Sequence, residues 1–173
     1  MKASPKREMR RLTKEKLIDY INIVNRNFWT LQGNWMVSIG ERYSNQVALE
    51  FDDICFGRCA EVQVYRLKKF FNLGSDIPSL IRIFTFSQFW STLDCEYDRV
   101  TDKQIIWRVT RCPMQLQRIK NGLGELPCKL SALSINEKIA KAINPKMKVA
   151  CLLCPPDSHP ENRWCEWLFE LRK

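Results

Sequence analysis

The sequence is poor in histidine, glycine and proline, and it has no long apolar run. Its one histidine, His159, excludes a metal site built from several histidines of one chain. Six glycines and eight prolines among 173 residues exclude collagen-like repeats and low-complexity sequence. No apolar run approaches the roughly 20 residues that a bilayer-spanning helix needs, so we expect no membrane partner.

Several common functional motifs are also missing. The sequence has no glycine-rich phosphate loop, no Gly-x-Ser-x-Gly nucleophile motif and no aromatic RNA-binding signature. The basic segment 1–16 is not followed by the apolar stretch of a secretory signal. We therefore expect a cytoplasmic protein.

The positive charge is concentrated at the N-terminus. The chain carries 28 Lys and Arg against 19 Asp and Glu, a net charge of +9. Residues 1–16 hold seven basic residues against Glu8 and Glu15, which accounts for +5 of that total. The nearly balanced remainder argues against nucleic acid as a partner. We expect residues 1–12 to form a frayed, basic arm.

Apolar spacing predicts helices in the first half of the chain. One stripe recurs at steps of three and four, namely Leu17, Ile21, Val24, Phe28, Leu31 and Trp35. Thr13 is the expected N-cap of that helix. Gly33 and Gly40 are both candidate stop signals, so the pattern does not define where the helix ends. A second stripe predicts a helix over 44–71 and contains Val47, Phe51, Ile54, Cys55, Arg58, Val62, Tyr65 and Phe70. A third helix is predicted over 78–90, with proline in its first turn.

The second half changes to the alternating pattern of strands. Strands are predicted near 93–98, 103–111, 147–153 and 165–171, with helices over 114–121 and 131–143 between them. We expect an α+β fold in a single domain 1–173, in which a helical half, 13–90, packs on an antiparallel sheet of about four strands within 91–173. The sheet face expected to meet the helices carries Cys95, Trp107, Cys151, Cys165 and Trp167.

Eight cysteines are many for a cytoplasmic chain of this length. Cys151, Cys154 and His159 have spacings that suit a zinc or iron site, and Cys165 follows shortly after. If the loop between the last two strands spans 155–161, Cys151 lies opposite Cys165. The alternative is that these cysteines are inert core residues, because positions i and i+3 of a regular strand point to opposite faces.

Cys112 and Cys128 lie at the ends of predicted elements rather than within an apolar stripe. Pro113 opens a helix, so the helix dipole and the nearby Arg111 and Arg118 would favour a thiolate at Cys112. The alternative is a small residue that fills a tight corner. Three carboxylates of the helical half are expected on solvated helix edges, and these are Glu41, Asp52 and Asp53.

Six segments carry a resemblance to a family of uncharacterised bacterial cytosolic proteins that covers most of the chain. They are Gly33-Asn-Trp35 with Glu41 and Tyr43, Arg111-Cys112-Pro113 with Gln115 and Arg118, Pro127-Cys128, Ile143-Asn-Pro145, Cys151-x-x-Cys154-Pro-Pro-Asp157, and Cys165-Glu-Trp167-x-Phe169. The C-terminal half also resembles the L-2-amino-thiazoline-4-carboxylate hydrolases and, more distantly, the 4-vinyl reductase small-molecule-binding domain. The hydrolase resemblance implies Cys112, Cys128 and Cys165 as catalytic residues.

The hydrolase family opens a cyclic amidine-like ring with water, and either a thiolate or a cysteine-held metal could serve that reaction. We favour a hydrolase-like enzyme acting on a small cyclic or anionic substrate that Arg118, Gln115 and Trp35 bind. The alternative is a non-catalytic sensor or carrier that binds a small molecule or a metal. An apolar surface left uncovered would serve a homodimer.

Overall fold

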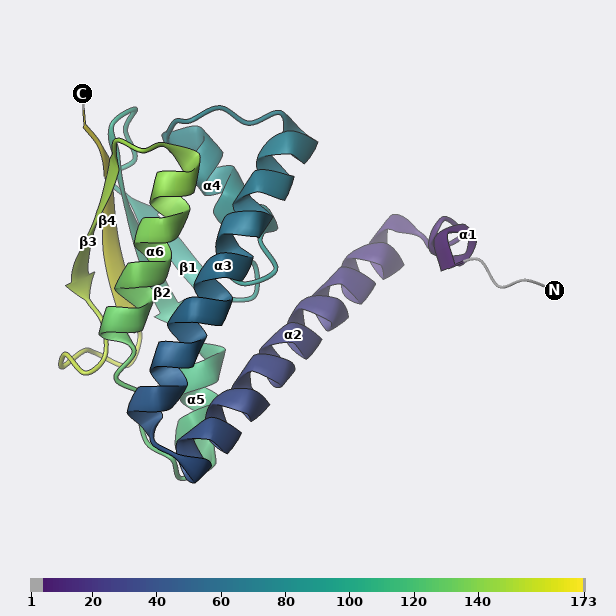
Figure 1. Cartoon of the computed structure of the whole chain (residues 1–173). Coiled ribbons are helices and arrows are strands. Elements are labelled where there is room, and N and C mark those ends of the chain that lie inside the picture. Colours follow the sequence, from purple (N-terminus) through teal and green to yellow (C-terminus); the bar gives the residue numbers. More distant parts are fainter. Residues whose placement is uncertain (1–4, 173) are drawn as a thin grey trace.

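The computed structural model describes residues 5–172 and has the α+β architecture predicted from the sequence (Figure 1). Within these residues there are six helices and one four-stranded sheet. In chain order they are α1 (Pro5–Met9), α2 (Lys14–Arg42), α3 (Asn45–Phe71), α4 (Ile77–Phe86), β1 (Asp94–Asp98), β2 (Gln104–Arg111), α5 (Pro113–Lys120), α6 (Lys129–Ile143), β3 (Met147–Leu153) and β4 (Cys165–Leu171).

Local capping explains where the long helices begin and end. Thr13 accepts a hydrogen bond from the backbone N–H of Lys16, as an N-cap should, and Ser44 caps α3 in the same way. Helix α3 ends at Asn72, whose φ of 52° is left-handed. The predicted third helix is shorter than expected, because Ser87 leaves the helical conformation and its hydroxyl donates to Gln63.

The sheet is antiparallel with the strand order β1-β2-β4-β3. Trp107 on β2 pairs with Trp167 on β4, at the centre of the sheet. The alignment of Cys151 with Cys165 is wrong, because Cys151 lies opposite Trp167. A shift in register between Cys151 and Leu153 follows, so the end of β3 does not continue the regular alternation.

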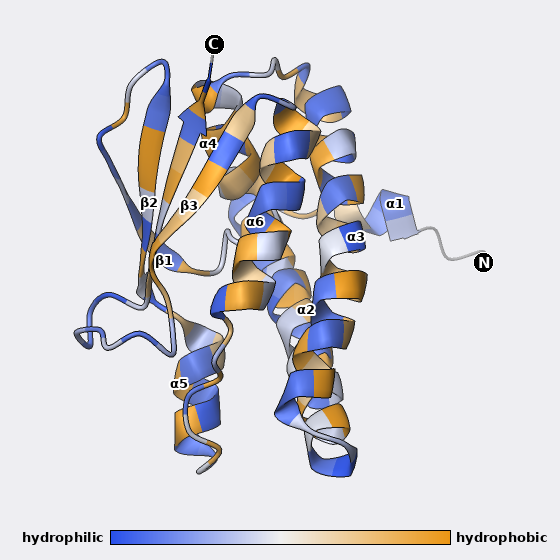
Figure 2. Ribbon diagram, turned by 60° about the vertical axis from the view of Figure 1, so that its left-hand side comes forward, coloured by the Kyte–Doolittle hydropathy of each residue, from blue (hydrophilic) through white to orange (hydrophobic). Residues whose placement is uncertain are grey.

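Helices α3, α4 and α6 lie on the same side of the sheet and share one hydrophobic core with it (Figures 1 and 2). The predicted helix-facing residues of the sheet all contribute: Trp107 and Trp167 are buried, while Cys95, Cys151 and Cys165 are half-buried against the same cluster. Among residues 5–172, no helix has the length and apolar character needed to cross a membrane.

The first half of α2 projects away from this body, and α1 lies at its far end (Figure 1). The expected frayed arm is instead helical over Pro5–Met9, and residues 1–4 lie outside the described part of the chain. Only the second half of α2 packs on α3, where Gln32 and Met36 are buried. This half of α2 also contributes to the wall of a pocket between the helices and the sheet.

Candidate ligand-binding site

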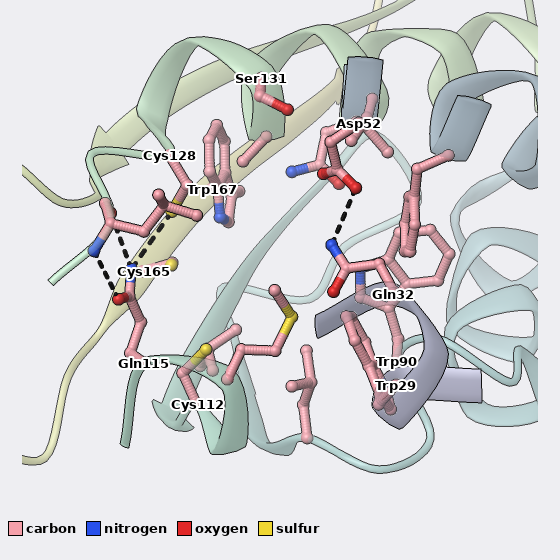
Figure 3. Close-up of a pocket in the computed structure, with 18 of the residues that line it drawn as sticks. Trp29, Gln32, Asp52, Trp90, Cys112, Gln115, Cys128, Ser131, Cys165 and Trp167 are labelled. Carbon is pink, nitrogen blue, oxygen red and sulfur yellow. Dashed lines mark hydrogen bonds between the residues drawn. The ribbon is translucent and has the colours of Figure 1, made fainter. Parts of the chain in front are cut away.

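A pocket of about 130 Å³ lies between the sheet and helices α2, α3, α5 and α6 (Figure 3). Its wall is largely aromatic and includes Trp29, Phe56, Trp90, Trp107 and Trp167. An apolar cavity of roughly 150 Å³ is known to take one benzene molecule. The space therefore fits a single ring with few substituents.

Five of the six residues that the sequence suggested for catalysis or substrate binding line this one pocket. They are Cys112, Cys128, Cys165, Gln115 and Arg118. Trp35 does not line it, and packs instead with a small cluster around Met36 and Leu49. The structure thus brings together residues that lie on β4, on α5 and at the start of α6.

Gln115 fixes the loop that leads to Cys128. Its side-chain amide donates to the carbonyl of Leu126 at 2.8 Å and accepts from the N–H of the same residue at 2.9 Å. The amide nitrogen also lies 3.5 Å from Cys128 Sγ. Because Gln115 is buried, this pair of bonds holds Cys128 at the N-terminus of α6 and on the pocket wall.

Three thiols form a chain beside the pocket. Cys154 Sγ lies 3.8 Å from Cys128 Sγ and 3.7 Å from Cys165 Sγ. Hydrogen bonds from Cys154 and then from Gln115 lower the pKa of Cys128, although burial opposes them. The pKa of Cys154 is raised, because this buried thiol lies between two others and holds its proton as a donor. Of Cys128 and Cys154, Cys128 is therefore the thiol that more readily becomes a thiolate.

Cys112 has the opposite character. Burial raises its pKa to about 12, although backbone N–H groups of Gln115 and Met114 act against that rise. Burial therefore outweighs the helix dipole that was expected to favour a thiolate at Cys112. Arg111 does not stabilise a thiolate either, because its side chain is exposed and its Nη1 lies 3.7 Å from Asp94 Oδ2. Cys112 is a neutral part of the pocket wall.

Asp52 lies in the pocket wall and not on the solvated helix edge that the sequence predicts. It lines the wall at 8% exposure and accepts a hydrogen bond of 2.8 Å from Gln32 (Figure 3). Burial raises the pKa of Asp52 to about 6, and the neighbouring Asp53 adds to the rise. A signal was present, since Asp52 is three residues after Leu49 and four before Phe56, both of which are buried on the same helix face.

Four buried polar atoms on the pocket-lining residues have no hydrogen-bond partner among the described residues. They are Gln32 Oε1, Trp107 Nε1, Arg118 Nε and Asn136 Oδ1. A buried polar atom without a partner costs on the order of 1–3 kcal/mol. Two of these atoms are donors, and two are acceptors.

The suggested metal ligands are not brought together. Cys154 faces Cys128 and Cys165, whereas the ring nitrogens of His159 lie 3.3 Å from Glu125 and 3.0 Å from the carbonyl of Pro160. Cys151 is half-buried against the core. Across residues 5–172, no group of three or more histidine, cysteine, aspartate or glutamate side chains is arranged to hold a metal ion.

Comparison with known proteins places the chain in a protein family. Residues 10–171 match a family of unknown function, DUF6125, and the chain belongs to this family. No curated protein matches the sequence. Among solved structures, the chain is similar to a trafficking protein particle complex subunit 3 from Naegleria fowleri covalently bound to palmitic acid. The identity is 12%, the TM-score is 0.49, and the alignment covers 89% of this chain and 96% of that one.

Proposed function

We propose that this protein binds a compact, ring-containing small molecule in the aromatic pocket. The ligand carries an acidic group for Arg118 and a cationic or hydrogen-bond-donating group for Asp52 and Gln32. The single observation that carries the proposal is the set of four unpartnered polar atoms on residues that line one apolar pocket of ring size.

Charge supports this choice of ligand. Within residues 5–172, no cationic side chain lies within ion-pairing distance of the buried Asp52, and no anionic side chain lies within that distance of the half-buried Arg118. Burial lowers the pKa of Arg118, so the guanidinium gains from an anion in the pocket. Asp52 and Gln32 lie across the pocket from Cys128 and Gln115, which leaves room for the ring between them (Figure 3).

Tryptophan fluorescence tests the proposal, because four tryptophans line the pocket. The probes are toluene, benzoate, benzamidine and 4-aminobenzoate. We expect Arg118→Gln to weaken benzoate binding roughly tenfold or more while leaving toluene unchanged, since only the charge contact is lost. Arg111→Gln, an exposed arginine outside the pocket, is the control. Failure of all four probes to bind the wild type at millimolar concentration would refute the proposal.

A second candidate function is hydrolysis of a cyclic amidine, and the lowered pKa of Cys128 favours it. The Cys128 thiolate would add to the amidine carbon, and protonated Asp52 would supply the proton that the departing ring nitrogen needs. Water would then release the product and regenerate the thiol. Incubation with 2-amino-thiazoline-4-carboxylate tests this, with Cys128→Ser as the inactive variant. If the wild type leaves this substrate unchanged, the hydrolase proposal is wrong, and the proposal of ligand binding without turnover remains.

A further inference from the structure

Two apolar stripes that predict core-facing helix surfaces are instead exposed. On α2, four of the six stripe residues remain exposed, and these are Leu17, Ile21, Val24 and Leu31 at 37–66%. On α3, seven of the eight stripe residues are exposed, and these are Phe51, Ile54, Cys55, Arg58, Val62, Tyr65 and Phe70. Large apolar patches of this kind mark interaction surfaces.

The first part of α2 is exposed on all sides. Every residue from Pro5 to Val24 is exposed, and Asn25 is the first buried residue of the chain's described part. Three turns of helix thus extend about 16 Å beyond the body at 1.5 Å per residue. Packing of an apolar face supplies most of the stability of a helix in a protein, and this part of α2 lacks such packing within one chain. We call residues 14–24 the α2 arm.

We infer that two copies of this chain pair in a two-fold dimer in which the α2 arm of each copy packs along the exposed stripe of α3 in the other. This inference is independent of the proposed function. One chain provides both halves of the contact, so a two-fold axis covers both stripes at once and closes the assembly.

The spacing of the two stripes supports helix-to-helix packing. The stripe on α2 advances by steps of four and three from Leu17 to Leu31. The stripe on α3 advances by the same alternation through Phe51, Cys55, Arg58, Val62 and Tyr65. Alternating steps of four and three form the seam of packed helices in coiled coils and four-helix bundles.

Charge fits a second copy as the partner. Helices α2 and α3 are antiparallel within one chain (Figure 1). A two-fold axis across α2 makes the two α2 helices antiparallel, so each arm runs parallel to α3 of the other copy. Lys14 and Lys16, with Glu15 between them, then reach the turn between α2 and α3, which carries the exposed Glu41, Arg42 and Glu50. The net charge is positive for the first group and negative for the second, which favours the closed pair.

The first experiment is sedimentation equilibrium of the full chain and two variants. We expect the wild type to have twice the 20.5 kDa mass of one chain. Ile21→Glu is expected to be monomeric, because it places a charge in the seam. Ile23→Glu is the matched control, as it changes an isoleucine of similar exposure on the opposite side of the same helix and should remain dimeric.

A second variant and a second readout separate dimer loss from misfolding. Val62→Glu changes the α3 stripe and should also give a folded monomer, which circular dichroism would confirm. Cys55 is an exposed thiol within that stripe. We expect its alkylation, followed by mass spectrometry, to be at least severalfold faster in Ile21→Glu than in the wild type.

Several outcomes would overturn the inference. A monomeric wild type would mean that a different molecule covers these stripes. Dissociation by Ile23→Glu as readily as by Ile21→Glu would place the contact elsewhere on α2. Equal reactivity of Cys55 in dimer and monomer would show that the arm does not lie along α3.

Discussion

Cys154 Sγ lies 3.8 Å from Cys128 Sγ, although 26 residues separate the two in sequence. Cys154 has one thiol proton and two sulfur neighbours, Cys128 and Cys165, so it can donate to only one of them at a time. The donation to Cys128 lowers the pKa of that thiol, and Gln115 adds a second donor. The pocket wall therefore contains one thiol of lowered pKa, Cys128, next to the protonated thiol of Cys154.

Removal of the Cys154 donor is expected to make Cys128 less acidic. Cys154→Ala deletes the S–H group, so the pH at which iodoacetamide modifies Cys128 at half its maximal rate should rise. Cys154→Ser keeps a hydrogen-bond donor and is the matched control. In this variant the pH of half-maximal modification should be at or below that of the wild type. Peptide mass spectrometry measures the rate at each pH. Equal midpoints in all three proteins would contradict this account of the thiol chain.

Replacement of Asp52 is expected to stabilise the protein at neutral pH. The folded state holds the proton of Asp52 up to about pH 6, whereas an unfolded aspartate releases it near 3.8. In that window the folded state binds more protons, so the free energy of unfolding falls as pH rises. Asp52→Asn has no carboxyl group to titrate, so this loss of stability with rising pH should disappear. The free energy of unfolding at pH 7 should rise by up to about 3 kcal/mol. Urea unfolding between pH 4 and pH 8 measures it.

Asp53 provides the contrast for that experiment. Its carboxylate lies 2.7 Å from Lys138 Nζ, in a pair that is about one-third exposed. Asp53→Asn should lower the stability at neutral pH slightly, because it removes an attractive pair. The same sign of change in both variants would show that burial does not govern Asp52.

Arg108 is expected to stabilise the order of three strands. Its guanidinium donates to Glu166 on β4 and lies within 3.7 Å of Glu96 and Asp98 on β1. Arg108→Ala leaves these carboxylates facing one another and should cost about 1–3 kcal/mol of unfolding free energy. Arg111→Ala, which removes an exposed pair with Asp94, should change little. Similar losses in both variants would contradict the role of the half-buried network.

Gly57 is expected to be nearly neutral to substitution despite a close contact. A Cβ there would lie 2.7 Å from Lys138 Nζ, at the flexible end of that side chain. Gly57→Ala gains about 0.5–1 kcal/mol of helix propensity but displaces Lys138 from Asp53. In a Lys138→Ala background the same change should be stabilising by that full amount. Thermal unfolding of the four proteins in a double-mutant cycle tests this.

Local patterns were enough to predict most elements of the fold. The strands around Trp107 and Trp167 follow from alternation, and the start of α2 follows from the expected cap, Thr13. These patterns involve residues that are close together in the sequence, so they can be recognised without the tertiary structure. The end of α4 was missed because a distant side chain, Gln63, binds Ser87.

The class of fold, the N-cap of α2 and the cysteines of interest could be predicted, because each depends on neighbours along the chain. The lowered pKa of Cys128 could not, because it depends on contact with Cys154 across 26 residues. Long-range packing also places Asp52 on the pocket wall and leaves most of the apolar stripes of α2 and α3 exposed. Periodicity marks a helix face as apolar, but what covers that face depends on how the helices cross and on what else binds there.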